Sequence, residues 1–399
     1  MDEFTLVLNA GSSSLKFAVY RRATGVHWNV AARGQVDGIG SASARLSVQD
    51  GTGSPLTAAY SAAKLGDGPA ALAHVADWLR AHFPGSRLAG VGHRVVHGGP
   101  RHAAPAIVTP ALIEELRELV PLAPLHQPHN LAAIETIAKR QPEVPQVACF
   151  DTSFHRGHST VAELVALPEQ FRRAGVQRYG FHGLSYEYIA SALLEAAPQI
   201  AAKRVIVAHL GSGASLCALS GGRSIDSTMG FTALDGLCMG TRPGAVDPGV
   251  LLFLFQSLRL SAQEVEAVLY KKSGLLGISG ISNDMRDLLK SNEPSARLAV
   301  DYFVFRAAKE IGALAAVLGG VDALVFTAGI GEKSPEIRRR ISEASAWLGI
   351  ELDQQANDAN AARLSRPSSA VSVWMIPTNE ELMIARHTWK LLGLIDARK

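Results

Sequence analysis

Short apolar runs alternate along the chain with stretches of helical spacing. Residues 4–8 and 15–20 are apolar or β-branched, and they flank a turn of small polar residues, so they predict a β-hairpin. The same pattern recurs about 200 residues later at 204–219. There His209-Leu210-Gly211-Ser212-Gly213 takes the place of the first turn. Such a repeat predicts two related domains that face each other.

Further strands and helices follow from the same patterns. We expect strands at 145–151 and 371–376, a strand that runs into a glycine-rich turn within 88–100, and another that enters a glycine-rich turn within 321–333. Helices are expected at 70–83, 109–119, 131–140, 248–258, 262–271 and 301–318. A long loop is expected at 226–248, and loops of that length usually carry function. The alternation of strands and helices indicates an α/β protein.

Composition narrows the class of protein. With 399 residues, 47% of them hydrophobic, the chain is long enough for two domains. A net charge of +3 gives no argument for nucleic acid, and the basic run 338–340 is expected to form a solvated helix face. No apolar run has membrane length, so a cytoplasmic protein without membrane contact is expected. Cys149, Cys217 and Cys238 are too widely spaced for a metal site, which favours core positions in a reducing compartment.

The first turn, Asn9 to Ser14, has the chemistry of a phosphate site. Gly11 allows close approach of the backbone, and the serine hydroxyls can donate to phosphate oxygens. Asn9 could offer an oxygen to a metal ion, and Lys16 a positive charge. An ordinary hairpin with a serine-rich turn is the alternative.

Three single residues stand out in the middle of the chain. Arg94 lies in an apolar segment, and a buried arginine needs an anion, which is either a substrate or a carboxylate in a structural ion pair. Asp151 ends an apolar strand, where α/β sheets bind their ligands. His182 lies between aromatic residues and glycines before a helix, as in a pocket wall.

One more segment is a candidate for binding a nucleotide. A glycine-rich turn at 329–332 follows a strand and precedes a helix, although such turns also occur without a ligand. A polar turn at 279–286 opens another helix. Neither a P-loop lysine motif, nor a GxGxxG fingerprint, nor the protein kinase motifs occur in the sequence.

The combined motifs resemble those of the acetokinase family of short-chain carboxylate kinases. The resemblance rests on LNAGSSSLKF, GHRVVHGG, FDTSFH, RYGFHGLS, HLGSGASL, DSTMGFTALDGLCMGTRPG, SGISNDMRD, TAGIGEKSPEIR and PTNEEL, in the order of the family. It implies the two-domain actin-like, sugar-kinase and heat-shock-protein ATPase fold with duplicated ribonuclease-H-like cores. The implied domains are an acyl- and phosphate-side domain, 1–150 plus 384–399, and a nucleotide-binding domain, 151–383, with a cleft between them.

The resemblance also assigns site residues. It implies metal ligands at Asn9 and Glu380, and catalytic roles for Arg94, Asp151, His182 and Arg242. Asp151 either transfers a proton or orients the metal, and metal orientation suits the chemistry better. The acyl group is expected on Arg94, Val96, Leu125, Phe181 and Ala233. ATP is expected on Ser12, Ser14, Lys16, His209, Leu210, Gly211, Ser212, Gly213, Asp284, Met285, Arg286, Gly329, Ile330, Gly331, Glu332 and Lys333.

The implied reaction is reversible transfer of the γ-phosphoryl group of ATP to acetate by direct in-line displacement, with Mg²⁺ or Mn²⁺ as cofactor and a homodimer as the assembly. Acetate is ionised at neutral pH, so catalysis must position two anions and neutralise their charge rather than remove a proton. Propionate or another short carboxylate is the alternative acceptor. A sugar kinase or an actin-like scaffold are rivals that would not need both arginines.

The sequence departs from the family in two places. Ala233 stands where many members have proline, which either enlarges the acyl pocket toward propionate or is a neutral packing difference. Tyr186 stands where the family has a second histidine after the one at His182. No role of that second histidine therefore transfers to this chain.

Overall fold

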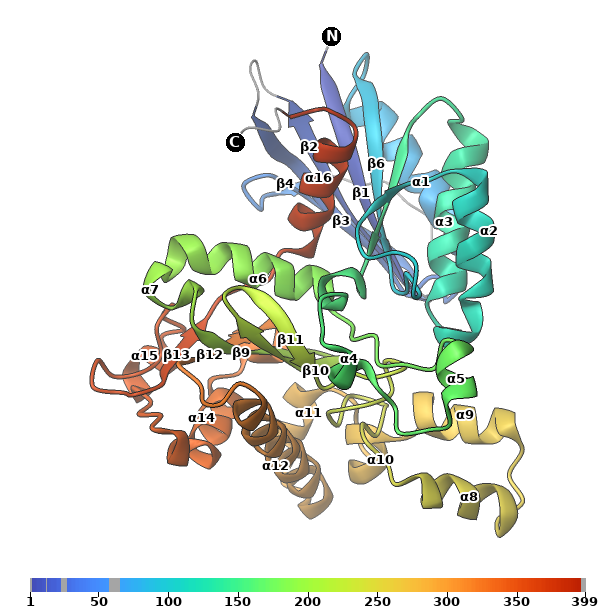
Figure 1. The fold of residues 1–399 in the computed structure, drawn as a ribbon. Coiled ribbons are helices and arrows are strands. Elements are labelled where there is room, and N and C mark those ends of the chain that lie inside the picture. The colour runs from blue at the N-terminus through green and yellow to red at the C-terminus, as the bar shows by residue number, and fades with distance from the viewer. Residues whose placement is uncertain (1, 12, 23–26, 57–64, 396–399) are drawn as a thin grey trace. The chain divides into compact units, whose positions relative to one another are not determined.

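The computed structural model describes residues 2–11, 13–22, 27–56 and 65–395 (Figure 1). The chain divides into two compact units, which we describe separately. Unit 1 comprises Met1–Ser153 and Asn379–Lys399, and unit 2 comprises Phe154–Thr378. The assignment of an acyl-side and a nucleotide-binding role to two domains stays a prediction.

Unit 1 is built on an eight-stranded mixed sheet in the order β5-β4-β3-β2-β1-β6-β8-β7. Strand β1 is antiparallel to β2, as the predicted hairpin requires, and parallel to β6, which in turn is parallel to β8. The strands are β1 (Glu3–Ala10), β2 (Ser14–Arg22), β3 (Trp28–Asp37), β4 (Arg45–Asp50), β5 (Pro55–Leu56), β6 (Arg87–Val95), β7 (Ala106–Ile107) and β8 (Gln146–Phe150).

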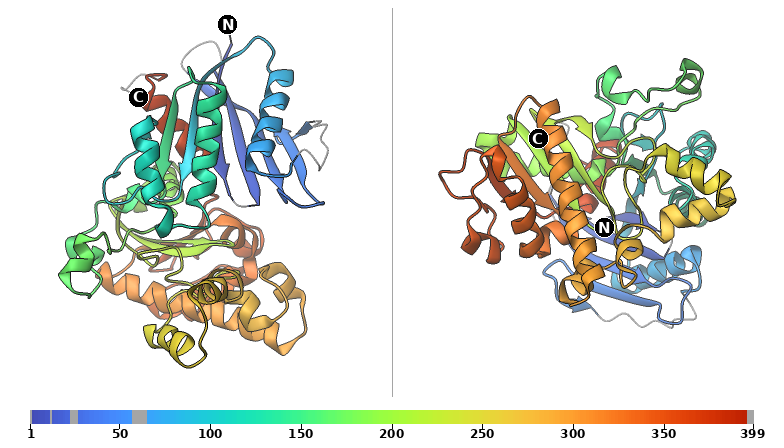
Figure 2. Two further views of the ribbon diagram at one scale, coloured as in Figure 1. Left: turned by 90° about the vertical axis from the view of Figure 1, so that its right-hand side faces the viewer. Right: turned by 90° about the horizontal axis from the view of Figure 1, so that it is seen from below.

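Helices cover both faces of this sheet (Figures 1 and 2). They are α1 (Gly68–His82), α2 (Pro110–Glu118), α3 (Gln127–Arg140) and α16 (Glu380–Leu391), with 3₁₀ turns at Val120–Leu122 and Ser153–His155. Helix α16 packs so closely on β6 that a Cβ atom on Gly92 would lie 2.3 Å from Thr388 Oγ1. Helices α1 and α3 bury the apolar side chains of β1 and β2, including Leu6 and Phe17.

Unit 2 has a five-stranded sheet in the order β11-β10-β9-β12-β13. Its strands are β9 (Arg204–Leu210), β10 (Ala214–Ser220), β11 (Arg223–Ser227), β12 (Ala323–Thr327) and β13 (Ser372–Met375). Strand β9 is antiparallel to β10 and parallel to β12, and β12 is parallel to β13. This order and these directions repeat those of β3-β2-β1-β6-β8 in unit 1, so the predicted duplication of a β-turn-β core is present.

Among the described residues, unit 2 has more helices than unit 1, and most of them are short, although one has 24 residues. They are α4 (Thr160–Glu163), α5 (Glu169–Arg173), α6 (Gly183–Ala196), α7 (Pro198–Ala201), α8 (Pro248–Gln256), α9 (Ala262–Lys271), α10 (Gly274–Ser279), α11 (Met285–Lys290), α12 (Pro294–Val317), α13 (Ala328–Lys333), α14 (Pro335–Ala344) and α15 (Gln354–Asp358), with a 3₁₀ turn at Ala346–Leu348. Helices α6 and α12 cover opposite faces of the sheet, and α12 crosses in front of it in the right-hand view of Figure 2.

Several expectations from the sequence need correction. The turn expected at 329–332 is itself helical, as part of α13, and α12 begins seven residues before the expected start at Asp301. Arg338 does not belong to a solvated face, because it is fully buried. Its guanidinium donates to the carbonyl oxygens of Gly331 and Glu332 and to Asn357, so it holds the end of α13.

The helix expected at 131–140 begins four residues earlier, at Gln127, whereas the expected loop and the core positions of the cysteines agree with the structure. No strand or helix is formed between β11 and α8, as expected for the loop at 226–248. All three cysteines are buried, as expected for core positions. Among the described residues, no helix combines the length and apolar character needed to cross a membrane.

Candidate functional site

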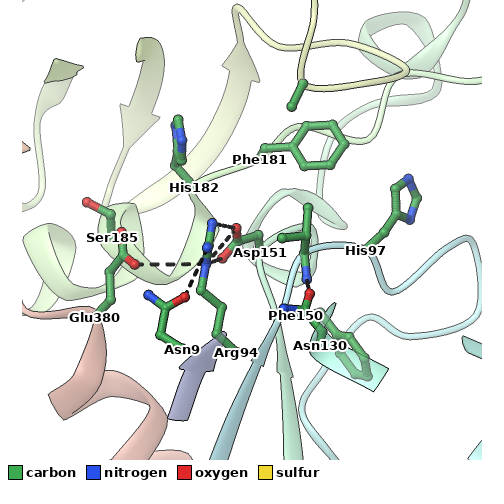
Figure 3. A network of polar contacts seen from close by, with 12 residues as sticks. Asn9, Arg94, His97, Asn130, Phe150, Asp151, Phe181, His182, Ser185 and Glu380 are labelled. Atoms are coloured by element: carbon green, nitrogen blue, oxygen red, sulfur yellow. Dashed lines mark hydrogen bonds and ion pairs between the residues drawn. The ribbon is translucent and has the colours of Figure 1, made fainter. Parts of the chain in front are cut away.

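The carboxyl ends of three parallel strands in unit 1 bring together Asn9, Arg94 and Asp151. Leu8 pairs with His93 and Val95 with Phe150, so the next side chains along β1, β6 and β8 converge. Arg94 donates from Nε to both Asp151 oxygens (3.2 and 3.1 Å), from Nη2 to Asp151 Oδ2 (2.5 Å), and from Nη1 to Asn9 Oδ1 (3.2 Å) (Figure 3). The sequence analysis gave Arg94 two possible anionic partners, a substrate or a carboxylate of the chain. The structure contains the ion pair with a carboxylate, that of Asp151.

Glu380, the first residue of α16, completes this group (Figure 3). Its Oε2 lies 3.9 Å from Arg94 Nε. Burial raises the pKa of Glu380 to about 7; Arg94 opposes the rise, and the charge of Asp151 adds to it. Burial also raises the pKa of Asp151, again against the effect of Arg94. One guanidinium thus faces two carboxylates, Asp151 buried and Glu380 half-buried. The two carboxylates together outweigh the charge of the guanidinium when both are ionised, and their oxygens suit a hard divalent cation.

Arg94 also keeps hydrogen-bonding capacity for an anion. A guanidinium has five N–H groups, and the bonds described above use one on each of its three nitrogens. One N–H therefore remains on Nη1 and one on Nη2. Burial disfavours the charged form, but Asp151 and Glu380 outweigh it and raise the pKa of Arg94, so the group stays cationic.

Other residues predicted for this side of the reaction also lie in unit 1. Lys16 is exposed and is the cross-strand partner of Asn9. The carbonyl of Ser14 closes the turn by accepting from Gly11 N (2.8 Å), whereas Ser12 lies outside the described residues. Val96 is buried and Leu125 half-buried. The sequence did not single out Asn130, which donates to Ala10 O (2.8 Å) and accepts from Val96 N (3.0 Å), tying the turn to β6.

In unit 2, His182 precedes α6 with φ 58°, a left-handed backbone that is uncommon for a residue other than glycine. Its ring stacks on His209 with centroids 4.2 Å apart, and its Nδ1 lies 2.7 Å from Ser215 Oγ. A Cβ atom on Gly213 would lie 2.8 Å from Arg242 Nη2 and 3.2 Å from His182 Nε2. Arg242 Nη2 and His182 Nε2 therefore both lie close to one point at the end of the β9–β10 turn.

Buried polar groups hold this part of unit 2 in place. His155 donates to the carbonyl of Phe181 (2.9 Å), which fixes the turn that carries His182. Burial lowers the pKa of His155 to about 3, and the proximity of His158 adds to the effect. Arg242 donates to the carbonyl of Ala233 (2.7 Å), so its loop is folded back on itself.

A cavity of about 640 Å³ in unit 2 gathers the three segments predicted to bind ATP. Eight of those residues line it: Gly211, Ser212, Asp284, Met285, Arg286, Gly329, Ile330 and Lys333. Asn283, Leu289, Lys290, Ser334, Pro335 and Glu336 also line it, although the sequence did not single them out. These residues are close neighbours of the predicted segments in the chain, and this proximity is the feature of the sequence that could have indicated them.

Of the residues of unit 2 that were predicted to bind ATP, five do not line this cavity: His209, Leu210, Gly213, Gly331 and Glu332. Glu332 instead accepts from the backbone N–H groups of Ala328 (2.9 Å) and Thr378 (3.0 Å). It thereby holds the turn that begins α13.

The family model of the acetokinase family matches residues 4–386. The chain belongs to the acetokinase family. It is 54% identical to an acetate kinase of Nitrobacter hamburgensis over 388 residues, 97% of this chain and 96% of that protein. It is 52% identical to an acetate kinase of Rhizobium meliloti over 393 residues, 98% of this chain and 99% of that protein.

Solved structures of the acetokinase family agree in fold. The acetate kinase of Porphyromonas gingivalis matches with a TM-score of 0.85 at 36% identity, covering 98% of this chain and 100% of that one. A propionate kinase of Francisella tularensis matches with a TM-score of 0.89 at 34% identity, covering 97% and 99%. The predicted family, fold and acetate kinase activity are therefore confirmed, while the roles of single residues stay predictions.

Proposed function

We propose that this member of the acetokinase family transfers the γ-phosphoryl group of ATP to acetate, reversibly and in one in-line step. An acetate oxygen forms a bond to the γ-phosphorus while the bond to the oxygen of ADP breaks. The observation that carries this proposal is the placement of Arg242 and His182 around one point beside Gly213, in the turn whose Gly211 and Ser212 line the nucleotide cavity. A cation and a hydrogen-bond donor at that point suit a transferring phosphoryl group.

Arg94 is proposed to hold the acceptor. Its remaining N–H groups, on Nη1 and Nη2, suit the two oxygens of a carboxylate. Asp151 and Asn9 fix the guanidinium so that it does not have to be ordered when the substrate binds. The alternative, that Arg94 has a structural role only, predicts that its removal costs stability but that the folded variant keeps its turnover.

Arg242 and His182 are proposed to stabilise the charge on the transferring group. The guanidinium is permanently cationic, and its loop is anchored through Ala233, so little reorganisation is needed during reaction. His182 donates a hydrogen bond to the same oxygens. No strong base is required, because the carboxylate acceptor is already ionised.

Asn9, Asp151 and Glu380 are proposed to hold Mg²⁺, with Mn²⁺ as a substitute, partly through water. The surplus of buried negative charge around Arg94 fits a divalent cation, and all three side chains offer oxygen atoms. When bound, the ion neutralises phosphate charge. Asp151 is then an orienting ligand rather than a proton carrier.

ATP is proposed to occupy the cavity of unit 2. The Gly211 N–H donates to Gly213 O within the turn (3.0 Å), so the N–H of Ser212 is proposed as a donor to a phosphate oxygen. Ser14 and Lys16 of unit 1 are proposed as further phosphate contacts. The methyl group of acetate is expected beside Val96, Leu125, Phe181 and Ala233. Propionate is the alternative acceptor, because Ala233 is smaller than the proline common in the family.

A homodimer is proposed from helix α8. Its sequence PGVLLFLFQ is apolar, yet none of its residues is buried, and Leu252 and Phe253 are more than half exposed. Exposed apolar surface of this kind favours a partner, and we propose a second copy of this chain. Sedimentation of the purified protein tests this: replacing Leu252 and Phe253 by serine should yield monomer, and an unchanged mass would contradict the assignment of α8.

The reaction is tested by trapping acyl phosphate with hydroxylamine, using acetate, propionate and butyrate in parallel. Acyl hydroxamate that forms with acetate and depends on ATP and Mg²⁺ supports the proposal. ATP hydrolysis without acyl phosphate would favour an actin-like scaffold. Phosphorylation of glycerol or a sugar in place of the carboxylates would favour the rival kinases.

A further inference from the structure

A short chain of hydroxyl groups reaches His182 from inside unit 2. Tyr186 OH lies 2.5 Å from Ser215 Oγ, which lies 2.7 Å from His182 Nδ1. Tyr186 and Ser215 are both fully buried. Tyr186 stands one helical turn after His182 in α6, whereas Ser215 comes from β10. The serine hydroxyl of the strand thus links Tyr186 of the helix to the ring of His182.

We propose that Tyr186, acting through Ser215, is a positioning residue that holds His182 in the tautomer whose Nε2 carries the proton. The inference rests on the proposed role of His182 as a donor to the transferring phosphoryl group. It adds two residues to that role, neither of which contacts the substrate.

The direction of the hydrogen bonds follows from donor counting. A phenol has one hydrogen, and Ser215 is the hydrogen-bond partner of Tyr186 OH among the described residues. If Tyr186 donates to Ser215, the serine hydrogen is left for His182 Nδ1, which must then be unprotonated. In the reverse direction the phenol hydrogen would be buried without an acceptor, which is costly.

Two observations agree with this direction. Burial raises the pKa of Tyr186 well above 10, so the phenol keeps its proton at any pH at which the protein works. The nitrogen that the proposal protonates, Nε2, is the one that lies beside Gly213 next to Arg242 Nη2. The proton therefore lies on the side of the ring where the phosphoryl group is proposed to react.

The neighbouring residue Ser185 makes a second link of the same kind. Its Oγ lies 2.8 Å from His209 Nδ1 and 2.9 Å from Thr378 Oγ1. Two stacked imidazoles are thus each held at Nδ1 by a serine hydroxyl. Tyrosine at 186, in place of the family's second histidine, gives this stack a donor that does not become cationic.

The first test reads the tautomer directly. In protein labelled with ¹⁵N-histidine, the ring nitrogens of His182, assigned by comparison with His182→Gln, should show a protonated Nε2 and an unprotonated Nδ1. Tyr186→Phe, which removes only the hydroxyl, should shift both resonances toward the average of the two tautomers. Turnover to acyl phosphate should fall roughly tenfold, with KM for acetate and ATP within about twofold of the unaltered protein.

Matched variants separate this effect from general damage. Tyr20→Phe removes the hydroxyl of another buried tyrosine, in unit 1, and should change neither resonance nor turnover. Ser215→Ala should reproduce Tyr186→Phe, and Ser215→Thr, which keeps a hydroxyl, should restore much of the turnover. Should Tyr186→Phe fail to fold, this serine pair gives the same comparison.

The outcomes are distinguishable. Unchanged His182 resonances in Tyr186→Phe and Ser215→Ala would overturn the inference. Shifted resonances with full turnover would uphold the link to Tyr186 but refute the catalytic role proposed for His182. Shifted resonances with reduced turnover would support both.

Discussion

The two sheets have the same strand order but different chemistry at the same edge. In unit 1, β1 and β6 end side by side at Asn9 and Arg94; in unit 2, β9 and β12 end at the paired residues His209 and Thr327. Unit 1 therefore places a cation there, paired with carboxylates, whereas unit 2 places an imidazole and a hydroxyl. A duplicated backbone fixes where side chains converge and leaves their charge to the sequence.

The electrostatic consequences differ accordingly. In unit 1, burial raises the pKa of Asp151 and of Glu380, and Arg94 opposes this rise. Removal of Arg94 would leave the two carboxylates without a cation, which is costly for buried charge. In unit 2, burial keeps His155 and His158 neutral by lowering the pKa of each. Removal of Arg94 should therefore lower both activity and stability, whereas removal of Arg242, which donates to a backbone carbonyl, should lower mainly activity.

The largest effect is expected from the two arginines. Arg94→Ala and Arg242→Ala should each lower kcat/KM by about a hundredfold or more, judged from the loss of a charge-stabilising donor. Arg94→Ala should also lower the free energy of unfolding by about 3 kcal/mol, because it leaves buried carboxylates unpaired, whereas Arg242→Ala should cost much less. The hydroxamate assay and urea unfolding measure the two effects.

Arg21→Ala is the control for these variants. Arg21 is exposed and pairs with Asp2, so its removal should leave both measurements nearly unchanged. Turnover of either active-site variant at the level of the unaltered protein would refute its catalytic role. Equal stability losses in the two variants would refute the contrast between the edges.

The next effect concerns stability alone. Arg338→Ala should lower the free energy of unfolding by about 3 kcal/mol, because several buried carbonyl and amide oxygens around Asn357 and α13 would lose their donor. Arg339→Ala, which removes a half-buried arginine paired with the exposed Glu336 and Glu343, should lower the free energy of unfolding by less than about 1 kcal/mol. Similar losses from these neighbours in urea unfolding would contradict the buried position of Arg338.

A smaller effect depends on pH. The pKa of His155 is about 3 and that of His158 about 4 in the folded chain, against about 6.5 when unfolded. Above pH about 6.5 neither state binds these protons; below it only the unfolded state does, so stability falls as the pH falls. Relative to neutral pH, each histidine should lower the free energy of unfolding by roughly 1 kcal/mol at pH about 5.5.

His158→Gln isolates this dependence. The variant removes one titrating group, so its urea midpoint should fall less between pH about 7.5 and 5.5 than that of the unaltered protein. Buried His93 in unit 1, whose pKa burial lowers to about 4, contributes equally to both and cancels in the comparison. An identical pH dependence would show that His158 is not held neutral.

The smallest effect is expected at Ala233. Ala233→Pro should narrow the acyl pocket and lower the ratio of kcat/KM for propionate to that for acetate, by less than about tenfold, since one methylene is worth about 1–3 kcal/mol at most. The Ala233 carbonyl that accepts from Arg242 is kept in this variant. A ratio that does not change would identify Ala233 as a neutral packing difference.

Local patterns predicted much of the fold. The two hairpins, the central strands and helix α9 at 262–271 follow directly from residue spacing and turn residues. The segments predicted to bind the nucleotide line one cavity. Each of them lies at the end of a strand or at the start of a helix in unit 2. The resemblance added the roles of Arg94 and Arg242, which no spacing rule supplies.

Where the sequence misled, the reason is packing. Three consecutive arginines suggested a solvated face, yet the helical period puts Arg338 beside Ile337 and Ile341 on the buried side of α14. Glu332 was expected to contact ATP and instead accepts from two backbone N–H groups. A charged residue can be recognised in a sequence, but its partner belongs to another element.

The sequence by itself determined the class of the protein, the duplicated β-turn-β core and the residue types available for phosphoryl transfer, because strand and turn signals act over a few residues. Only the tertiary structure decided which charges neutralise one another. Asp151 and Glu380 lie 57 and 286 residues beyond Arg94 in the chain, and they meet it through strand register and the docking of α16. The same holds for Tyr186, whose link to His182 runs through a serine of another strand.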